Sequence, residues 1–314
     1  MITIIGSLNY DMVTYTKRVP EAGETVQGDF FEAHLGGKGM NECVAVASLV
    51  APGSGSKVRM WGRIGDDPQG ELFLKKLKSL NVDTTLVKKL SNIRSGSATI
   101  LVEDLTGENR IVVIGGANGK LHPTATELAE NFPLRSSEKQ YVVLQNEFPD
   151  PLAVIDWLSN NRPEVVTFYN PSPLKKELLN RDTLNKVSFL VVNRTEAWDL
   201  VGEEEQDDNT LVITKLRKLL DKPTFIVTLG SKGCIFSESG SDTFRSVPSR
   251  KVNNVVDTTG AGDTFLGGIV TRLHGGDDLE EAINFAAAAS SLAIQVKGAV
   301  EGIPNYKAVE ALLI

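Results

Sequence analysis

Six short runs of consecutive apolar residues are the feature that most constrains how this chain can fold. They occupy residues 2–6, 58–65, 141–147, 165–170, 189–193 and 224–230. Runs of this length without alternation predict strands that are buried on both faces, as in a parallel sheet. Helical patterns fall between them, at 39–50, 68–80, 123–132, 151–160, 195–202 and 209–221. The alternation predicts an α/β fold with a doubly wound, mostly parallel central sheet flanked by helices.

Two stretches, 12–35 and 97–114, have a different pattern, because apolar and polar residues alternate in them. Such alternation predicts strands with one exposed face, and EDLTGEN at 103–109 resembles a hairpin turn between two of them. We expect a small four-stranded β lid beside the main sheet, within a single domain that spans 1–314. An extension of the main sheet is the alternative. Three further helices are predicted at 262–274, 278–296 and 305–313.

The composition favours some classes of partner over others. The chain has 314 residues and a net charge of −7, which argues against nucleic acid, since a phosphate-binding face needs clustered Lys and Arg. Its apolar runs are well short of the roughly 20 residues of a membrane span. Cys43 and Cys234 each lie in an apolar run, so we expect buried free thiols in a reducing compartment. The three histidines lack metal-ligand spacing, which argues against zinc. We therefore expect a cytoplasmic protein, also nuclear if the source is eukaryotic.

The segment DTTGAGDTFLGG, which begins at Asp257, is the strongest candidate for chemistry. Gly260, Ala261 and Gly262 allow close approach to the backbone, and the first N–H groups of the helix that follows have no internal partner. Together they form an anion site suited to phosphate. Asp263 would repel a bound phosphate, but it suits a base that takes a proton from an attacking hydroxyl. The alternative is plain helix capping by Asp263 and an Asx turn at Asp257.

A second glycine-rich segment, LGGKGMNECVAVASL, lies near the N-terminus. Gly37 and Gly39 predict another helix start with close backbone access. Lys38 could meet a phosphate, and the amide of Asn41 suits a polyhydroxylated ligand. A solvated turn is the alternative for this segment.

Three strand ends add polar groups at the edge where doubly wound sheets bind ligands. Asn9 and Asp11 in GSLNYD could hold neighbouring sugar hydroxyls, with an Asx turn as the alternative. In NRTE, Glu196 could hold Mg²⁺ through water, whereas capping is the alternative for Asn193. TLGSKG, 228–233, could hold phosphate oxygens or form a hairpin turn. The chain has no Walker A loop and no dinucleotide fingerprint, which disfavours an NAD-dependent dehydrogenase.

Six motifs in order carry a resemblance along nearly the whole chain: GSLNYD, GGKGMN, QNE, NRTEA, TLGSKG and DTTGAGDTFLGG. The chain resembles the ribokinase family of carbohydrate kinases. The resemblance implies an α/β domain whose four-stranded lid also pairs two subunits. It implies transfer of the γ-phosphoryl group of ATP to the 5-hydroxyl of D-ribose. Fructose, deoxyribose and adenosine are rival acceptors, and an inactive sugar-binding regulator is the alternative from another class.

The resemblance also implies roles by position. Asp263 would be the base, and the anion hole would be Gly260, Ala261 and Gly262. The sugar would be held by Asn9, Asp11, Gly37, Lys38, Gly39, Asn41 and Glu147. The nucleotide phosphates and Mg²⁺ would be held by Asn193, Glu196, Thr228, Gly230, Ser231 and Gly233. An activating monovalent cation, usually K⁺, would be held by Asp257, Thr259, Ala293, Val296 and Gly298. Three residues depart from the family pattern: Gly302 where serine is common, Ala287 where a polar residue is common, and Glu42 where glutamine is common.

Overall fold

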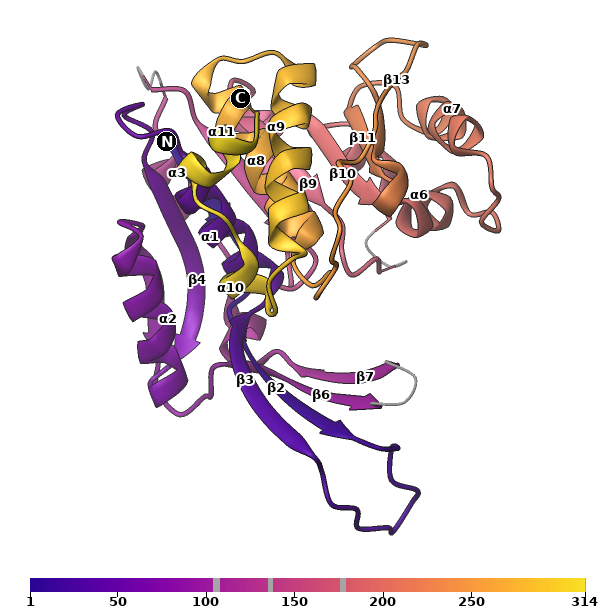
Figure 1. Cartoon of the computed structure of the whole chain (residues 1–314). Helices are drawn as coiled ribbons and strands as arrows, with labels where there is room; N and C mark the ends of the chain where they lie inside the picture. The colour runs from indigo at the N-terminus through magenta and orange to yellow at the C-terminus, as the bar shows by residue number, and fades with distance from the viewer. Residues whose placement is uncertain (104–107, 135–137, 176–178, 314) are drawn as a thin grey trace.

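The computed structural model describes residues 1–103, 108–134, 138–175 and 179–313, and it shows an α/β body from which a small sheet extends (Figure 1). The body sheet has nine strands in the order β13-β12-β11-β10-β9-β8-β1-β4-β5. Neighbouring strands are parallel except for the two pairs that involve β12. The predicted doubly wound sheet is therefore confirmed. The strands are β1 (Ile2–Ile5), β4 (Val58–Gly65), β5 (Asp83–Leu90), β8 (Tyr141–Gln145), β9 (Val166–Asn170), β10 (Phe189–Asn193), β11 (Thr224–Thr228), β12 (Cys234–Ser237) and β13 (Arg245–Val247).

Helices cover both faces of this sheet, which explains why the apolar runs are continuous. In β1, Ile2 and Ile4 belong to one buried cluster and Ile5 belongs to the other. The first cluster includes residues of α1 (Lys38–Leu49), α2 (Pro68–Ser79), α8 (Ala261–Gly275) and α9 (Leu279–Ala293). The second includes residues of α3 (Ala125–Asn131), α4 (Pro151–Asn161), α5 (Arg181–Leu184), α6 (Arg194–Val201) and α7 (Asn209–Leu219). The chain is completed by η1 (Gly116–Lys120), η3 (Gly230–Lys232), α10 (Ala299–Gly302) and α11 (Tyr306–Leu313).

Three body strands were not predicted, and each lies toward an edge of the sheet. In β5, at one end of the strand order, Val87 is buried while the neighbouring lysines are exposed. In β12 and β13, four and three residues are too few to show a pattern. Several predicted elements end earlier than expected, since β8 stops at Gln145, β11 at Thr228, α7 at Leu219 and α9 at Ala293.

The lid is a separate sheet, as predicted, and not an extension of the body sheet. Its order is β3-β2-β6-β7, formed by β2 (Asn9–Thr16), β3 (Phe30–Gly36), β6 (Gly96–Glu103) and β7 (Asn109–Ile114). The first lid strand begins earlier than the predicted residue 12, so Asn9 and Asp11 belong to the lid sheet. The predicted turn at 103–109 lies mostly outside the described residues. All six residues of β7 are exposed.

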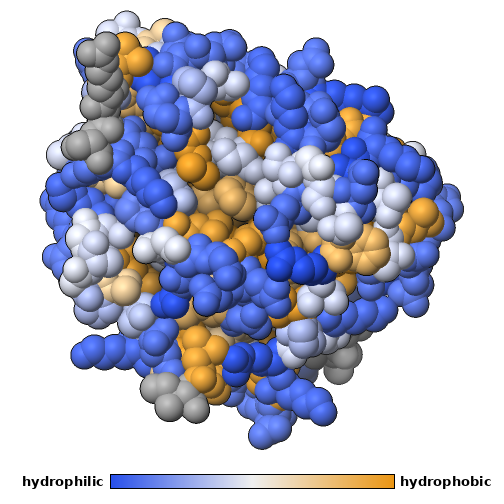
Figure 2. All heavy atoms as spheres, turned by 90° about the horizontal axis from the view of Figure 1, so that it is seen from above, coloured by the Kyte–Doolittle hydropathy of each residue, from blue (hydrophilic) through white to orange (hydrophobic). Residues whose placement is uncertain are grey.

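The end of the body away from the lid has a mostly hydrophilic surface (Figure 2). Seen from above, its hydrophobic residues form small patches among hydrophilic side chains (Figure 2). In Figure 1, β4 points toward the lid, so the carboxyl edge of the parallel strands faces it. Among the helices that the structure describes, none combines the length and the apolar character needed to cross a membrane.

Candidate functional site

Two helix N-termini, those of α1 and α8, form the centre of the candidate site. Each follows a glycine with a positive φ, 86° at Gly37 and 74° at Gly260, a conformation that favours glycine. A Cβ atom on Gly39 would lie 2.5 Å from the amide nitrogen of Ser7, so α1 starts in contact with the end of β1. A Cβ atom on Gly260 would lie 2.9 Å from that of Ala299. Close packing therefore requires glycine at both helix starts.

The carboxylate of Asp263 joins the two helices. Its Oδ1 lies 3.1 Å from Lys38 Nζ, and its Oδ2 accepts a hydrogen bond from Asn41 Nδ2 at 2.8 Å. The side chain thus reaches α1 and does not cap its own helix, so the capping alternative does not describe Asp263. Burial acts to lower the pKa of the Lys38 ammonium, but nearby carboxyl groups, led by Asp263, raise that pKa by more. A cation and an amide therefore hold this carboxylate in place.

Several residues predicted to bind the sugar meet at Glu147, which follows β8. Its Oε2 accepts a hydrogen bond from the backbone N–H of Lys38 at 2.9 Å and another from the hydroxyl of Ser7. Asn9 Nδ2 lies 3.5 Å from the same oxygen. The hydroxyl of Ser7 in turn accepts from the N–H of Gly39 at 3.3 Å. Ser7 was missed by the sequence analysis, although it lies within GSLNYD.

Asp11 lies in the lid strand that leaves this cluster. Burial, followed by the neighbouring Glu147 carboxylate, raises the pKa of Asp11 to about 7. A Cβ atom on Gly36 would lie 2.0 Å from Asp11 Oδ2, so the carboxyl group packs against the end of β3. Asn118 is a second residue that was missed: its Nδ2 donates to Asn9 Oδ1 at 2.8 Å. Asn118 is buried in η1, beyond the predicted lid segment, and no local pattern marks it in the sequence.

A cavity of about 640 Å³ opens beside the first turn of α8. Gly262 lines it, and apart from its own stretch of helix no described atom lies within 4 Å of where a Cβ atom on Gly262 would be. Ser290 on α9 supports the turn, because its hydroxyl donates to Ala261 O at 2.9 Å. Four of the residues predicted to bind the nucleotide line this cavity: Thr228, Gly230, Ser231 and Gly233. Ala261 and Ala287 line it as well. The basic pair Arg250 and Lys251 lines the cavity as well, and the sequence analysis missed it.

Comparisons with known proteins agree with this geometry. The sequence model described as pfkB family carbohydrate kinase matches residues 1–305. The chain belongs to the pfkB family of carbohydrate kinases. A ribokinase of Schizosaccharomyces pombe is 35% identical over 98% of this chain and 96% of its own. A deoxyribokinase of Salmonella typhi is 32% identical over 98% of this chain and 96% of its own. The structure of Arabidopsis thaliana ribokinase complexed with ribose and ATP superposes with a TM-score of 0.85, at 29% identity, over 99% of this chain and 98% of that one.

Within this pfkB-family kinase, Asn193 and Glu196 are placed differently from the other predicted nucleotide residues. They form a capping box at the start of α6, in which Asn193 Oδ1 accepts from Glu196 N and Glu196 Oε2 accepts from Asn193 N. Asn193 pairs with Thr228 across β10 and β11, but neither Asn193 nor Glu196 is among the described residues that line the cavity. The capping alternative thus describes Asn193 here, and binding of Mg²⁺ near Glu196 stays a prediction.

The residues predicted to hold a monovalent cation come from two segments that the pfkB fold brings together. Asp257 Oδ1 accepts from Thr259 N at 2.9 Å, as in an Asx turn, and its Oδ2 accepts from Gly298 N at 2.9 Å. A Cβ atom on Gly302 would lie 2.8 Å from Ala293 O and 3.4 Å from Val296 O. Glycine at 302 therefore leaves both carbonyl oxygens uncrowded. Among the described residues, no group of three or more His, Cys, Asp or Glu side chains is arranged to hold a metal ion.

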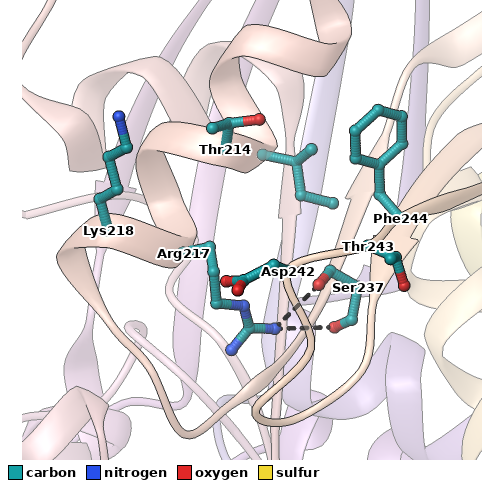
Figure 3. A pocket seen from close by; sticks show the side chains of 8 residues that line it. Thr214, Arg217, Lys218, Ser237, Asp242, Thr243 and Phe244 are labelled. Carbon is teal, nitrogen blue, oxygen red and sulfur yellow. Dashed lines mark hydrogen bonds between the residues drawn. The ribbon is translucent and has the colours of Figure 1, made fainter.

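A smaller cavity of about 240 Å³ lies between α7 and the end of β12, away from the pfkB-family motifs (Figure 3). Arg217 is one of its two basic lining residues, and its Nη2 donates to the carbonyl and the hydroxyl oxygen of Ser237 at 3.1 Å each. Its Nη1 donates to Asp221 O at 2.7 Å, and its guanidinium lies 4.4 Å from the ring centroid of Phe225. Arg217 is thus engaged in holding the sheet edge. The two cysteines, Cys43 and Cys234, are free and buried as predicted.

Proposed function

We propose that this sugar kinase is a ribokinase, which transfers the γ-phosphoryl group of ATP to the 5-hydroxyl of D-ribose and yields D-ribose 5-phosphate. The observation that carries the proposal is the position of Asp263. Asp263 comes directly after Ala261 and Gly262, which line the large cavity. Its carboxylate contacts two residues of the predicted sugar site, Lys38 and Asn41. A base between a phosphate pocket and a sugar pocket is what direct phosphoryl transfer requires.

In the proposed reaction, ATP occupies the cavity and ribose lies between Asp11, Asn41 and Glu147. Asp263 accepts the proton of the 5-hydroxyl while that oxygen attacks the γ-phosphorus and the bond to the β-phosphate oxygen breaks, which releases ADP. The first-turn N–H groups of α8, at Gly262 and Asp263, stabilise the negative charge on the transferred group. Lys38 forms an ion pair with the base at 3.1 Å and adds positive charge beside the reacting groups.

Two cations belong to the proposal. Mg²⁺ would accompany ATP and neutralise phosphate charge, with Glu196 reaching it through water. K⁺ would be held by Asp257, Thr259, Ala293, Val296 and Gly298, and the uncrowded carbonyl oxygens of Ala293 and Val296 beside Gly302 fit that role. Initial rates in KCl against choline chloride at equal ionic strength test the second cation. Rates that do not differ between the two salts would remove K⁺ from the proposal.

A substrate panel tests the acceptor. ADP release is measured with ribose, 2-deoxyribose, fructose and adenosine at equal concentrations, and we expect the highest kcat/KM with ribose. Deoxyribose is the rival that the Salmonella typhi relative supports. Equal or better turnover of fructose, deoxyribose or adenosine would overturn the ribose assignment. Intact ribose binding with no ADP release above a no-sugar control would favour an inactive sugar-binding regulator.

We also propose that two copies pair through the lid and that the enzyme acts in the cytoplasm. In β7, Ile111, Val112, Val113 and Ile114 are each more than half exposed, at the edge of the lid sheet. An exposed apolar edge strand is a surface that natural proteins usually cover. Sedimentation equilibrium should give a dimer, and Val112→Lys should weaken it. A wild-type monomer at micromolar concentration would contradict the pairing.

A further inference from the structure

A carboxyl side chain with no exposed surface lies directly behind the proposed phosphoryl-transfer site. Glu42, on α1, is 0% exposed and follows Asn41, whose amide holds Asp263. Glu42 Oε2 accepts a hydrogen bond from Nε2 of Gln145, the last residue of β8, which is also 0% exposed. Burial of an ionised carboxylate costs much free energy unless the charge is paired. The question is therefore whether Glu42 has a partner for a negative charge.

The charged groups around Glu42 do not provide one. On α1, the Lys38 ammonium is engaged with Asp263 at 3.1 Å, and the buried Cys43 adds a thiol. Asp263 on α8 and Glu147 beyond β8 both carry carboxyl groups, which disfavour a further negative charge nearby. Burial, followed by the Asp263 carboxylate, raises the pKa of Glu42 well above its ordinary value. The Lys38 ammonium and the hydrogen bond from Gln145 lower the pKa of Glu42, but burial and the two carboxyl groups outweigh them and favour the neutral acid.

Two oxygens of this pair supply independent evidence. Glu42 Oε1 and Gln145 Oε1 are both buried, and neither has a hydrogen-bond partner among the residues that the structure describes. Buried polar atoms are nearly always hydrogen-bonded. A single proton on Glu42 Oε1 would satisfy both atoms, because the new O–H can donate to the amide oxygen of Gln145. The acid and the primary amide would then share two hydrogen bonds, one in each direction.

We propose that Glu42 is a positioning residue carried as a neutral acid, joined to Gln145 by two hydrogen bonds that tie the first turn of α1 to the end of β8. Asn41 precedes Glu42, and Glu147 lies two residues beyond Gln145, so the tie fixes both. It also leaves Asp263 as the carboxylate in direct contact with the Lys38 ammonium. The positioning role rests on the proposed phosphoryl transfer, whereas the proton on Glu42 is measured on the protein without substrate.

An infrared difference spectrum tests the proton directly. Glu42→Gln keeps the shape of the side chain, since two amides can also share two hydrogen bonds, but it removes the carboxyl group. Wild type minus this variant at pH 7 should show the carbonyl band of a protonated carboxylic acid, which shifts to lower frequency in D₂O. Carboxylate bands in that difference spectrum would overturn the proposal.

Thermal unfolding gives a second test with a predicted sign. In the unfolded chain Glu42 ionises near its ordinary pKa of 4.5, whereas the folded protein retains its proton. Wild-type stability is therefore lost relative to Glu42→Gln as the pH rises above 4.5 toward the pKa of the folded state. The Tm of the variant minus that of wild type should increase from pH 5 to pH 8. A constant or shrinking difference would contradict a neutral Glu42.

A swap of the two side chains tests the positioning role. Gln145→Glu places two carboxyl groups together and should lower kcat by about tenfold or more, since small misplacements at a reaction centre are costly. Adding Glu42→Gln restores one acid and one amide, so the double variant should recover most of the lost kcat with KM for ATP unchanged. A double variant no faster than Gln145→Glu would overturn the role. If no sugar were phosphorylated by wild type, the proposed function would fail while the spectroscopic and thermal tests would still decide the proton.

Discussion

The first turns of α6 and α8 lie near the same edge of the central sheet but are built in opposite ways. In α6, Asn193 and Glu196 satisfy each other's N–H groups at 2.8 and 2.9 Å. In α8, the cap is Gly260, which has no side chain to offer, and Asp263 turns away toward α1. A capping box uses the free N–H groups for folding, whereas an uncapped turn leaves them for a ligand. The comparison teaches that an acidic residue in a first turn signals function only when its contacts lie on another element.

The largest effect should come from the base at the open turn. We expect Asp263→Ala to lower kcat by about 10²–10⁴, the usual contribution of a general base. Asp263→Asn is the matched control, because it keeps the bond to Lys38 or Asn41 but cannot take a proton. Steady-state rates with ribose and ATP measure both variants. Near-normal turnover in either variant would show that Asp263 is not the base and has a structural role, as Asn193 and Glu196 have in α6.

Substitutions at the two glycines of the uncapped turn of α8 should have different effects, one on ATP binding and the other on stability. Gly262 faces open space in the cavity, so Gly262→Val should lower kcat/KM for ATP by about 10²-fold with little change in Tm. Gly260→Ala should instead lower Tm, because of the positive φ and the contact with Ala299. A crystal structure of Gly262→Val with ATP bound normally would break the close-approach argument.

The predicted sugar site beside α1 can be tested by pH through Asp11 on β2. A neutral acid at Asp11 can no longer accept two sugar hydroxyls as a carboxylate does. Since burial and Glu147 raise its pKa to about 7, KM for ribose should rise by about tenfold per pH unit below that value. KM values from pH 5.5 to 8.5 measure this. In Asp11→Asn the curve should be flat, and an unchanged slope would assign the titration to another group.

The smallest effect on activity should come from the first turn of α6, whose N–H groups are satisfied by its capping box. Asn193→Ala removes the cap of α6 and should lower the free energy of unfolding by about 1 kcal/mol. Urea unfolding measures that loss, and Asn193→Asp is the control that keeps an acceptor. We expect kcat to stay within about fivefold of wild type, the equivalent of 1 kcal/mol. A larger fall that excess MgCl₂ restores would show that α6 binds the nucleotide as well.

Much of the body could be predicted from the sequence because strands buried on both faces leave continuous apolar runs. The edge strand β5 could not, since a strand with few buried side chains lacks that signal. The glycine turns were visible as motifs, but the contact between Asp263 and Lys38 joins residues 225 positions apart. No local pattern shows which way such a carboxylate points. The same holds for Asn118, which supports Asn9 from a segment 109 residues away.

The lid strands run directly into the predicted sugar site, with no linker between the two. In the lid sheet Asn9 pairs with Gly36 on one side and with Gly96 on the other. Gly36 is followed at once by the turn that starts α1. A displacement of the lid strands would therefore move Asn9 and Asp11 of the predicted sugar site directly. A compound that binds only the outer lid strands β3 and β7, far from any reacting atom, should shift Asn9 and Asp11 and so change the affinity for the sugar.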